Sequence, residues 1–65
     1  MDDVHNYRCT FYDGAGKVIG FDAHDFSDDE MARTWANRLN VPSAATRREL
    51  RDDYHVVETA SLPGV

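Results

Sequence analysis

Acidic side chains and one histidine gather in a short stretch of the chain, and these residue types bind metals or transfer protons. They are Asp22, His24, Asp25, Asp28 and Asp29. A metal site needs ligands that converge on one point, usually with further residues that hold them in place. Aspartates at a helix start more often cap it or stay solvated. We therefore predict no metal site, and His5 and His55 are too distant in sequence to be assigned as ligands.

Two other features resemble parts of catalytic or nucleotide-binding sites. Cys9 alternates with apolar neighbours, which predicts a buried, inert thiol, because a nucleophile needs an adjacent base and a lowered pKa. The run Gly14-Ala15-Gly16-Lys17 resembles part of a phosphate loop, but it lacks the glycine that the loop needs further upstream, and Val18 stands where the loop requires Ser or Thr. We therefore predict a hairpin turn here, and no catalytic residue, no cofactor and no enzymatic activity.

Arginine and tyrosine side chains are the best candidates for binding a partner. One cluster contains Arg47, Arg48, Arg51 and Tyr54, and a second, on the solvent side of the first hairpin, contains Arg8 and Tyr12 beside Lys17. Such side chains stack on bases and pair with phosphates in nucleic-acid complexes. They are also favoured at protein interfaces. A third interpretation is local salt bridging of the first cluster to Glu49, Asp52 and Asp53.

Length and charge limit the classes of function. The 65 residues are enough for one domain, residues 1–65, with residues 1–5 and 61–65 expected to be loose termini. The net charge of −5 disfavours nucleic-acid binding by the whole surface. The charge is uneven, because residues 1–30 hold eight acids against two basic residues.

Composition also indicates where the protein works. One cysteine excludes an internal disulfide, no apolar run approaches a membrane span, and the first residues lack the features of a signal peptide. We expect a cytoplasmic, acidic protein with no membrane partner. Arginine greatly outnumbers lysine, which is typical of GC-rich bacterial genomes.

The elements that position these residues centre on one helix, predicted over residues 28–39. Ser27 and Glu30 have the spacing of a capping box, and Phe26 and Met31 that of a hydrophobic staple. Acidic residues in the first turn suit the helix dipole. We predict a left-handed Asn40 at the end, and Pro42 prevents continuation of the helix.

Two strands, residues 6–12 and 17–23, precede this helix as a hairpin. A four-residue loop would turn Ile19 and Phe21 away from the face shared by Cys9 and Phe11. A three-residue loop pairs Phe11 with Ile19, Cys9 with Phe21 and Tyr7 with Ala23, and places Gly16 where a left-handed residue is needed. We therefore predict the three-residue loop, because a slip of one residue would send half of the core to water.

The last third of the chain is less distinct. Thr46 and Glu49 have capping-box spacing, which predicts a short helix or loop before residue 54. Residues 54–59 are rich in β-favouring types and predict a third strand, although Leu50, Tyr54 and Val57 also fit one helical face. The predicted fold class is a small single-domain α+β protein, in which a β-hairpin packs on one amphipathic helix and a third strand closes the sheet, a ββαβ-like order.

This fold leads to a predicted core and two functional hypotheses. The core comprises one face of residues 54–59 together with Tyr7, Cys9, Phe11, Ile19, Phe21, Phe26, Met31, Trp35, Leu39 and Leu50. A chain this short has a thin core and open sheet edges, which invite pairing with another chain. We expect a small bacterial-type binding or assembly module that binds a protein partner or forms a homodimer. The alternative is a nucleic-acid-associated regulator that uses the arginine cluster.

Overall fold

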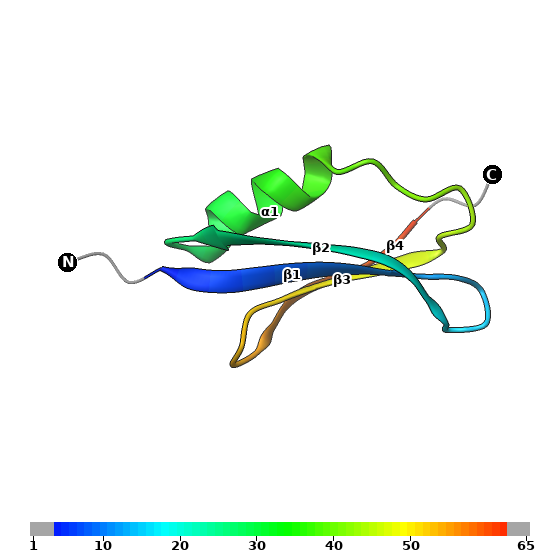
Figure 1. Cartoon of the computed structure of the whole chain (residues 1–65), viewed down its shortest axis with the longest axis horizontal. Coiled ribbons are helices and arrows are strands. Elements are labelled where there is room, and N and C mark those ends of the chain that lie inside the picture. The colour runs from blue at the N-terminus through cyan, green and yellow to red at the C-terminus, as the bar shows by residue number, and fades with distance from the viewer. Residues whose placement is uncertain (1–3, 63–65) are drawn as a thin grey trace.

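A computed structural model describes residues 4–62 and contains one helix and one four-stranded antiparallel sheet. Its elements in chain order are β1 (His5–Tyr12), β2 (Val18–Phe26), α1 (Asp29–Arg38), β3 (Arg47–Arg51) and β4 (Val56–Ser61). The strands lie in the order β2-β1-β3-β4, and α1 covers one face of the sheet (Figure 1). The predicted α+β class, with a hairpin packed on a helix, is confirmed.

The core lies between α1 and β1, one of the two central strands. Tyr7, Cys9 and Phe11 alternate along β1 and are buried against α1, as period-two side-chain geometry requires. The rest of the buried apolar core is Leu50 and three small residues, Ala32, Ala36 and Ala45. Two alanines on the inner stripe of α1 bring the helix close to the sheet. The core is therefore thin and one-sided.

The register of the first hairpin differs from the prediction beyond its first pair. Tyr12 pairs with Val18, as a three-residue loop requires, and Gly16 has the expected positive φ of 82°. The register then shifts between Phe11 and Tyr12, so Phe11 pairs with Gly20. This β-bulge turns Phe21 to the other face of the sheet, where it is 66% exposed. The predicted core position of Phe21 is therefore wrong.

The ends of α1 also differ in detail from the prediction. Asp28, rather than Ser27, is the N-cap, and its side chain accepts a hydrogen bond from the Met31 N–H at 2.8 Å. The hydroxyl of Ser27 instead donates to the sulfur of Met31 at 3.4 Å. At the other end Leu39 has an extended backbone, and within residues 4–62 no residue other than glycine has a positive φ. The predicted left-handed Asn40 is therefore wrong.

Residues 47–51 form strand β3 rather than part of a short helix. They pair with β1 on one side and with β4 on the other. Tertiary pairing overrides the local capping pattern, because the ladder satisfies backbone groups on both sides of the strand. The predicted third strand at residues 54–59 is confirmed as strand, but it lies at Val56–Ser61 and is fourth in order.

The expected loose termini fall partly outside the described residues. Residues 1–3 and 63–65 are not described, whereas His5 begins β1 and Ser61 ends β4. The Leu62 N–H donates to the Thr46 carbonyl at 2.9 Å, so the ordered chain continues further than predicted.

Most of the remaining core prediction agrees with the structure. Met31 is the further exception, at 50% exposure, because Ala32 and Ala36 occupy the buried stripe of α1. Partly buried apolar side chains surround the core, namely Ile19, Phe26, Trp35, Leu39, Val57 and Leu62. Within residues 4–62 no helix is both long and apolar enough to cross a membrane.

Candidate functional site

The face of the sheet opposite α1 collects most of the predicted partner-binding residues. Arg8 pairs with Arg51, and Tyr12 with Arg47, in the antiparallel ladder between β1 and β3. Directly paired residues point to the same side, and these four alternate with Cys9 and Phe11 of β1 and with Arg48 and Leu50 of β3, which face α1. Phe21 joins them through its pairing with Thr10. We call Arg8, Tyr12, Phe21, Arg47 and Arg51 the open face.

Cation–aromatic contacts already order the open face. The Arg47 guanidinium lies 4.2 Å from the centre of the Tyr12 ring, and that of Arg8 lies 5.7 Å from the Phe21 ring. Arg51 approaches the Glu49 carboxylate at 4.0 Å. Each cation–aromatic contact contributes about 0.5–1 kcal/mol at an exposed site. They orient the arginines without removing them from solvent, so the open face can bind anionic or aromatic groups.

Two of the predicted partner-binding residues lie elsewhere. Arg48 faces α1 and is buried, and it donates from Nη2 to Asn37 at 2.6 Å and to Glu58 at 2.8 Å. Its assignment to a surface cluster is therefore wrong, because alternation along β3 sends it to the opposite side from Arg47 and Arg51. Tyr54 is 82% exposed between β3 and β4, with its ring centre 6.4 Å from that of His5.

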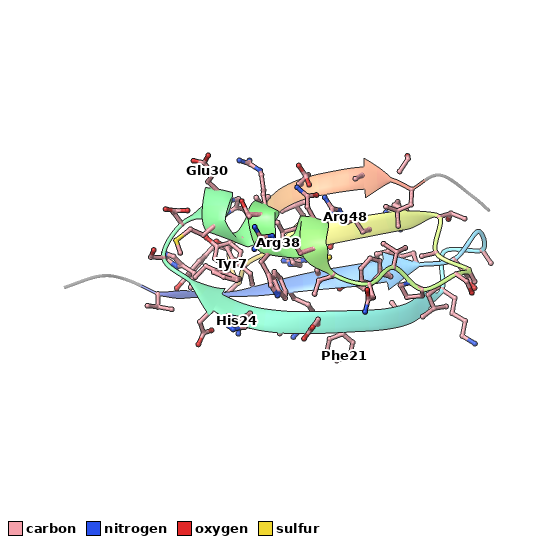
Figure 2. The ribbon with its side chains drawn as sticks, turned by 90° about the horizontal axis from the view of Figure 1, so that it is seen from above. Tyr7, Phe21, His24, Glu30, Arg38 and Arg48 are labelled. Atoms are coloured by element: carbon pink, nitrogen blue, oxygen red, sulfur yellow. The ribbon has the colours of Figure 1, made fainter. Side chains whose placement is uncertain are left out.

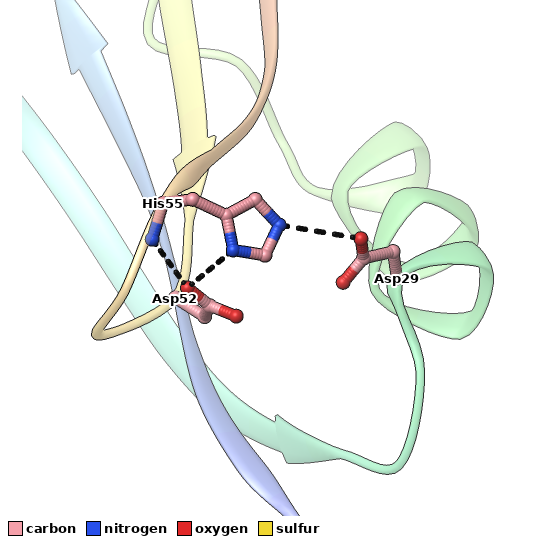
Figure 3. Close-up of side chains that lie close together, drawn as sticks. All are labelled: Asp29, Asp52 and His55. Carbon is pink, nitrogen blue, oxygen red and sulfur yellow. Dashed lines mark hydrogen bonds and ion pairs between the residues drawn. The ribbon is translucent and has the colours of Figure 1, made fainter.

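A cluster that the sequence did not reveal lies where the β3–β4 loop meets the start of α1 (Figure 3). His55 places Nδ1 3.2 Å from Asp52 and Nε2 3.4 Å from Asp29. Asp52 also accepts the backbone N–H groups of Tyr54 and His55, both at 2.8 Å. The Tyr7 hydroxyl donates a hydrogen bond to the Asp29 carboxylate at 2.7 Å. We call Asp29, Asp52 and His55 the loop cluster.

The pKa shifts in the loop cluster have identifiable causes. Burial, followed by the hydrogen bond to Asp29, raises the pKa of Tyr7 to about 12. The same hydrogen bond is the largest cause that lowers the pKa of Asp29, and His55 adds to it. Burial acts to raise the pKa of Asp52, but the N–H groups of Tyr54 and His55 outweigh it, so that pKa is lowered.

The loop cluster connects two elements that are distant in sequence. Oxygen and nitrogen atoms of Asp29, Asp52 and His55 lie within 4.8 Å of one another, a spacing that a metal ion could bridge. However, each imidazole nitrogen already faces a carboxylate, with Asp52 on one side of the ring and Asp29 on the other. In this structure both ring nitrogens of His55 therefore have a carboxylate partner. The imidazole instead joins the β3–β4 loop to α1.

The acidic residues singled out in the sequence do not converge. Asp28 caps α1, Asp25 accepts a hydrogen bond from Asn6 at 3.0 Å, and Asp22 accepts one from the Ala23 N–H at 2.9 Å. Of the residues first considered as ligands, only Asp29 joins the one metal-sized cluster found within residues 4–62. No signal in the sequence could have joined Asp29 to Asp52 and His55, because that proximity arises from the fold.

The predicted burial of Cys9 is confirmed. Its exposure is 0%, and burial raises the pKa of the thiol, which keeps it protonated and unreactive at neutral pH.

The outer side of β2 is the remaining candidate surface. β2 has nine residues and is the first strand of the order β2-β1-β3-β4 built by residues 4–62, so β1 is its one neighbour there. Most of its side chains are exposed on both faces of the sheet. Beside it, His24 and Phe26 form a groove with Met31, Trp35 and Arg38 of α1. Figure 2 shows β2 alongside α1, with His24 and Phe21 on its outer side.

Comparisons with known proteins do not add to this geometry, since no protein-family model, curated protein or solved structure matches the chain.

Proposed function

We propose that the chain is a small assembly module that binds a second copy of itself. The observation that carries this proposal is the long outer edge of β2, with its exposed side chains. An unprotected edge strand presents a row of backbone donors and acceptors to another strand. The strand at the opposite edge, β4, is shorter, with six residues, and is irregular near its start, which makes it a poorer template.

The thin core supports the same function. α1 covers one face of the sheet, and three of the seven buried apolar residues are alanines. A chain of about 60 residues buries roughly 60% of the surface that its unfolded form exposes. A partner that pairs with β2 would form hydrogen bonds with its outward backbone groups and cover the groove beside α1. Self-association therefore adds to the stability of the folded chain.

Light scattering or sedimentation over a dilution series in the micromolar range tests this proposal. We expect a species of about twice 7.4 kDa that dissociates on dilution. A mass that stays at 7.4 kDa over the whole series would exclude self-association.

The open face supports a second candidate, binding of single-stranded nucleic acid. Three of its five residues are arginines, and they lie beside two aromatic rings on one side of the sheet. Bases can stack on such rings and guanidinium groups, while arginines pair with phosphates. Net charge opposes this function, so binding must come from the local surface.

Fluorescence anisotropy with a labelled single-stranded oligonucleotide at low salt tests the second candidate. We expect Arg8→Ala, Arg47→Ala and Arg51→Ala together to abolish binding, and Arg38→Ala, an exposed arginine on α1, to preserve it. Equal losses from both variants, or no binding by the parent, would exclude the open face as a nucleic-acid site.

A further inference from the structure

We infer that two copies pair antiparallel along β2, with Ala23 of one copy opposite Ala23 of the other. This inference rests on the proposed self-association and names its interface. The pairing joins two four-stranded sheets into one and places both helices on the same face. It also brings together the two grooves between β2 and α1.

The direction of the free backbone groups sets which residues of β2 can pair. The Ala23 N–H donates to the side chain of Asp22 at 2.9 Å. The Asp25 carbonyl lies 3.0 Å from Nδ1 of His24. Backbone groups alternate along a strand, so those of Phe21, Ala23 and Asp25 face outward and those of Asp22 and His24 face β1.

The two side chains that flank Ala23 therefore occupy groups that a second strand would use. In the monomer, the Asp22 side chain bonds the outward N–H of Ala23, and the His24 side chain bonds the outward carbonyl of Asp25. Pairing replaces each of these hydrogen bonds with one between backbones. It also releases an acidic and an imidazole side chain on the α1 side of the sheet.

The sequence of β2 is self-complementary about Ala23. With Ala23 at the two-fold axis, Asp22 of each copy lies opposite His24 of the other. Gly20, which has no side chain, lies opposite the bulky Phe26. A carboxylate can accept a hydrogen bond from an imidazole that lies opposite it, whereas like charges opposite each other destabilise an antiparallel pair. The two-fold axis generates each of these pairs twice, so each contributes twice to the stability of the dimer.

The other face of β2 agrees with this register. Phe21 of one copy lies opposite Asp25 of the other. The Arg8 guanidinium lies above the Phe21 ring at 5.7 Å, so the incoming Asp25 carboxylate approaches a positive charge. Two-fold pairing can also be centred on Asp22 or His24, but those registers place identical ionisable groups face to face. The axis at Ala23 avoids both clashes.

The groove beside α1 extends the contact beyond the strand. Its lining includes Met31, which is 50% exposed, together with His24 and Trp35. An apolar groove along a free edge is exposed in a separate chain and is covered when a second copy adds its own β2 and α1. Contacts through the groove add apolar burial to the backbone hydrogen bonds.

Charge exchange at the central pairs tests the register. Asp22→Lys places Lys opposite His24, and His24→Asp places Asp opposite Asp22. We expect each single variant to raise the dimer dissociation constant on the order of tenfold, because it removes the carboxylate–imidazole pair on both sides of the two-fold axis. The double variant places Lys opposite Asp twice and should restore the parent affinity. Thermal unfolding of each variant at low concentration checks that the chain stays folded.

Crosslinking gives an independent readout of the axis. Ala23→Cys brings two thiols together at the axis, and a short bis-maleimide reagent should link them in high yield. Thr59→Cys, an exposed position on β4, is the matched control and should link poorly. The native Cys9 is buried and contributes little background.

The possible outcomes separate this inference from the function on which it rests. A dimer that tolerates both single charge variants and links no better through position 23 than through position 59 would overturn the β2 interface but leave self-association standing. A parent chain that stays monomeric at all concentrations would overturn both.

Discussion

Arg48 and Glu58 lie on adjacent strands and form an ion pair of 2.8 Å on the α1 side of the sheet. The Arg48 side chain is 9% exposed and that of Glu58 is 34% exposed, so the arginine is the more buried partner. Nη2 of Arg48 also donates to Asn37 on α1. One guanidinium thereby joins β3, β4 and the helix.

Removal of this guanidinium should destabilise the fold. We expect Arg48→Ala to lower the free energy of unfolding by about 2 kcal/mol, because hydrogen bonds to charged groups contribute roughly 1.5–3 kcal/mol. Arg48→Met should lose less, since it keeps the apolar stem and removes Nε, which has no hydrogen-bond partner within residues 4–62. Urea unfolding measures both. The control is Arg47→Ala on the open face, and an equally large loss there would contradict the buried position of Arg48.

The helix cap should depend on Asp28. Asp28→Ala removes the acceptor for the Met31 N–H and should cost about 1 kcal/mol, or roughly 4–8 °C in melting temperature for a domain of this size. Ser27→Ala should have little effect, because its hydroxyl contacts a sulfur atom. Thermal unfolding of the two variants identifies the N-cap residue. A larger fall in melting temperature for Ser27→Ala than for Asp28→Ala would indicate that Ser27 is the cap.

Acid should weaken the fold through Asp52 and Asp29. The pKa of each is lower in the folded state, so the folded state binds fewer protons than the unfolded chain. The stability from these groups is present above a pH of about 4 and is lost as the pH falls below it. Asp52→Asn should flatten the fall in urea midpoint between about pH 5 and pH 3. Asp29 is 41% exposed and should contribute less, because solvent screens it. An unchanged slope in Asp52→Asn would contradict this role.

The bulge in the first hairpin should make the stability of the fold depend strongly on Leu50 and only weakly on Phe21. Leu50 is 0% exposed, so Leu50→Ala should cost about 2–5 kcal/mol. Phe21→Ala should change the stability of the monomer by about 1 kcal/mol or less, because the ring is mainly in solvent and loses only its contact with Arg8. Chemical unfolding at low protein concentration compares them. A large loss from Phe21→Ala would indicate the register without the bulge.

Local patterns in the sequence were sufficient to predict the elements whose formation depends on neighbouring residues. Alternation from Asn6 to Tyr12 predicted a strand, Gly16 predicted the positive φ of the turn, and the acidic first turn together with Pro42 beyond the last turn predicted the helix. Each signal involves backbone sterics or side chains a few residues apart, and so does not depend on any distant contact. The α+β class follows from these elements together.

Tertiary structure decided the features that depend on contacts between distant segments. The β-bulge inserts Ile19 between Val18 and Gly20, which are paired with Tyr12 and Phe11, and it moves Phe21 to the other face of the sheet. No local sequence pattern marks the position of this bulge. Residues 47–51 become a strand because β1 and β4 pair with them, and that pairing sends Arg48 into the interior.

The same division applies to the candidate sites. The sequence predicted arginines and tyrosines as candidate binding residues, but pairing between β1 and β3 placed Arg8, Tyr12, Arg47 and Arg51 on one face. Asp29 and His55 lie 26 residues apart, and the fold alone brings them together. The sequence determined the residue types and local periods, and the sheet determined which of them meet, because strand pairing joins positions whose distance along the chain carries no local signal.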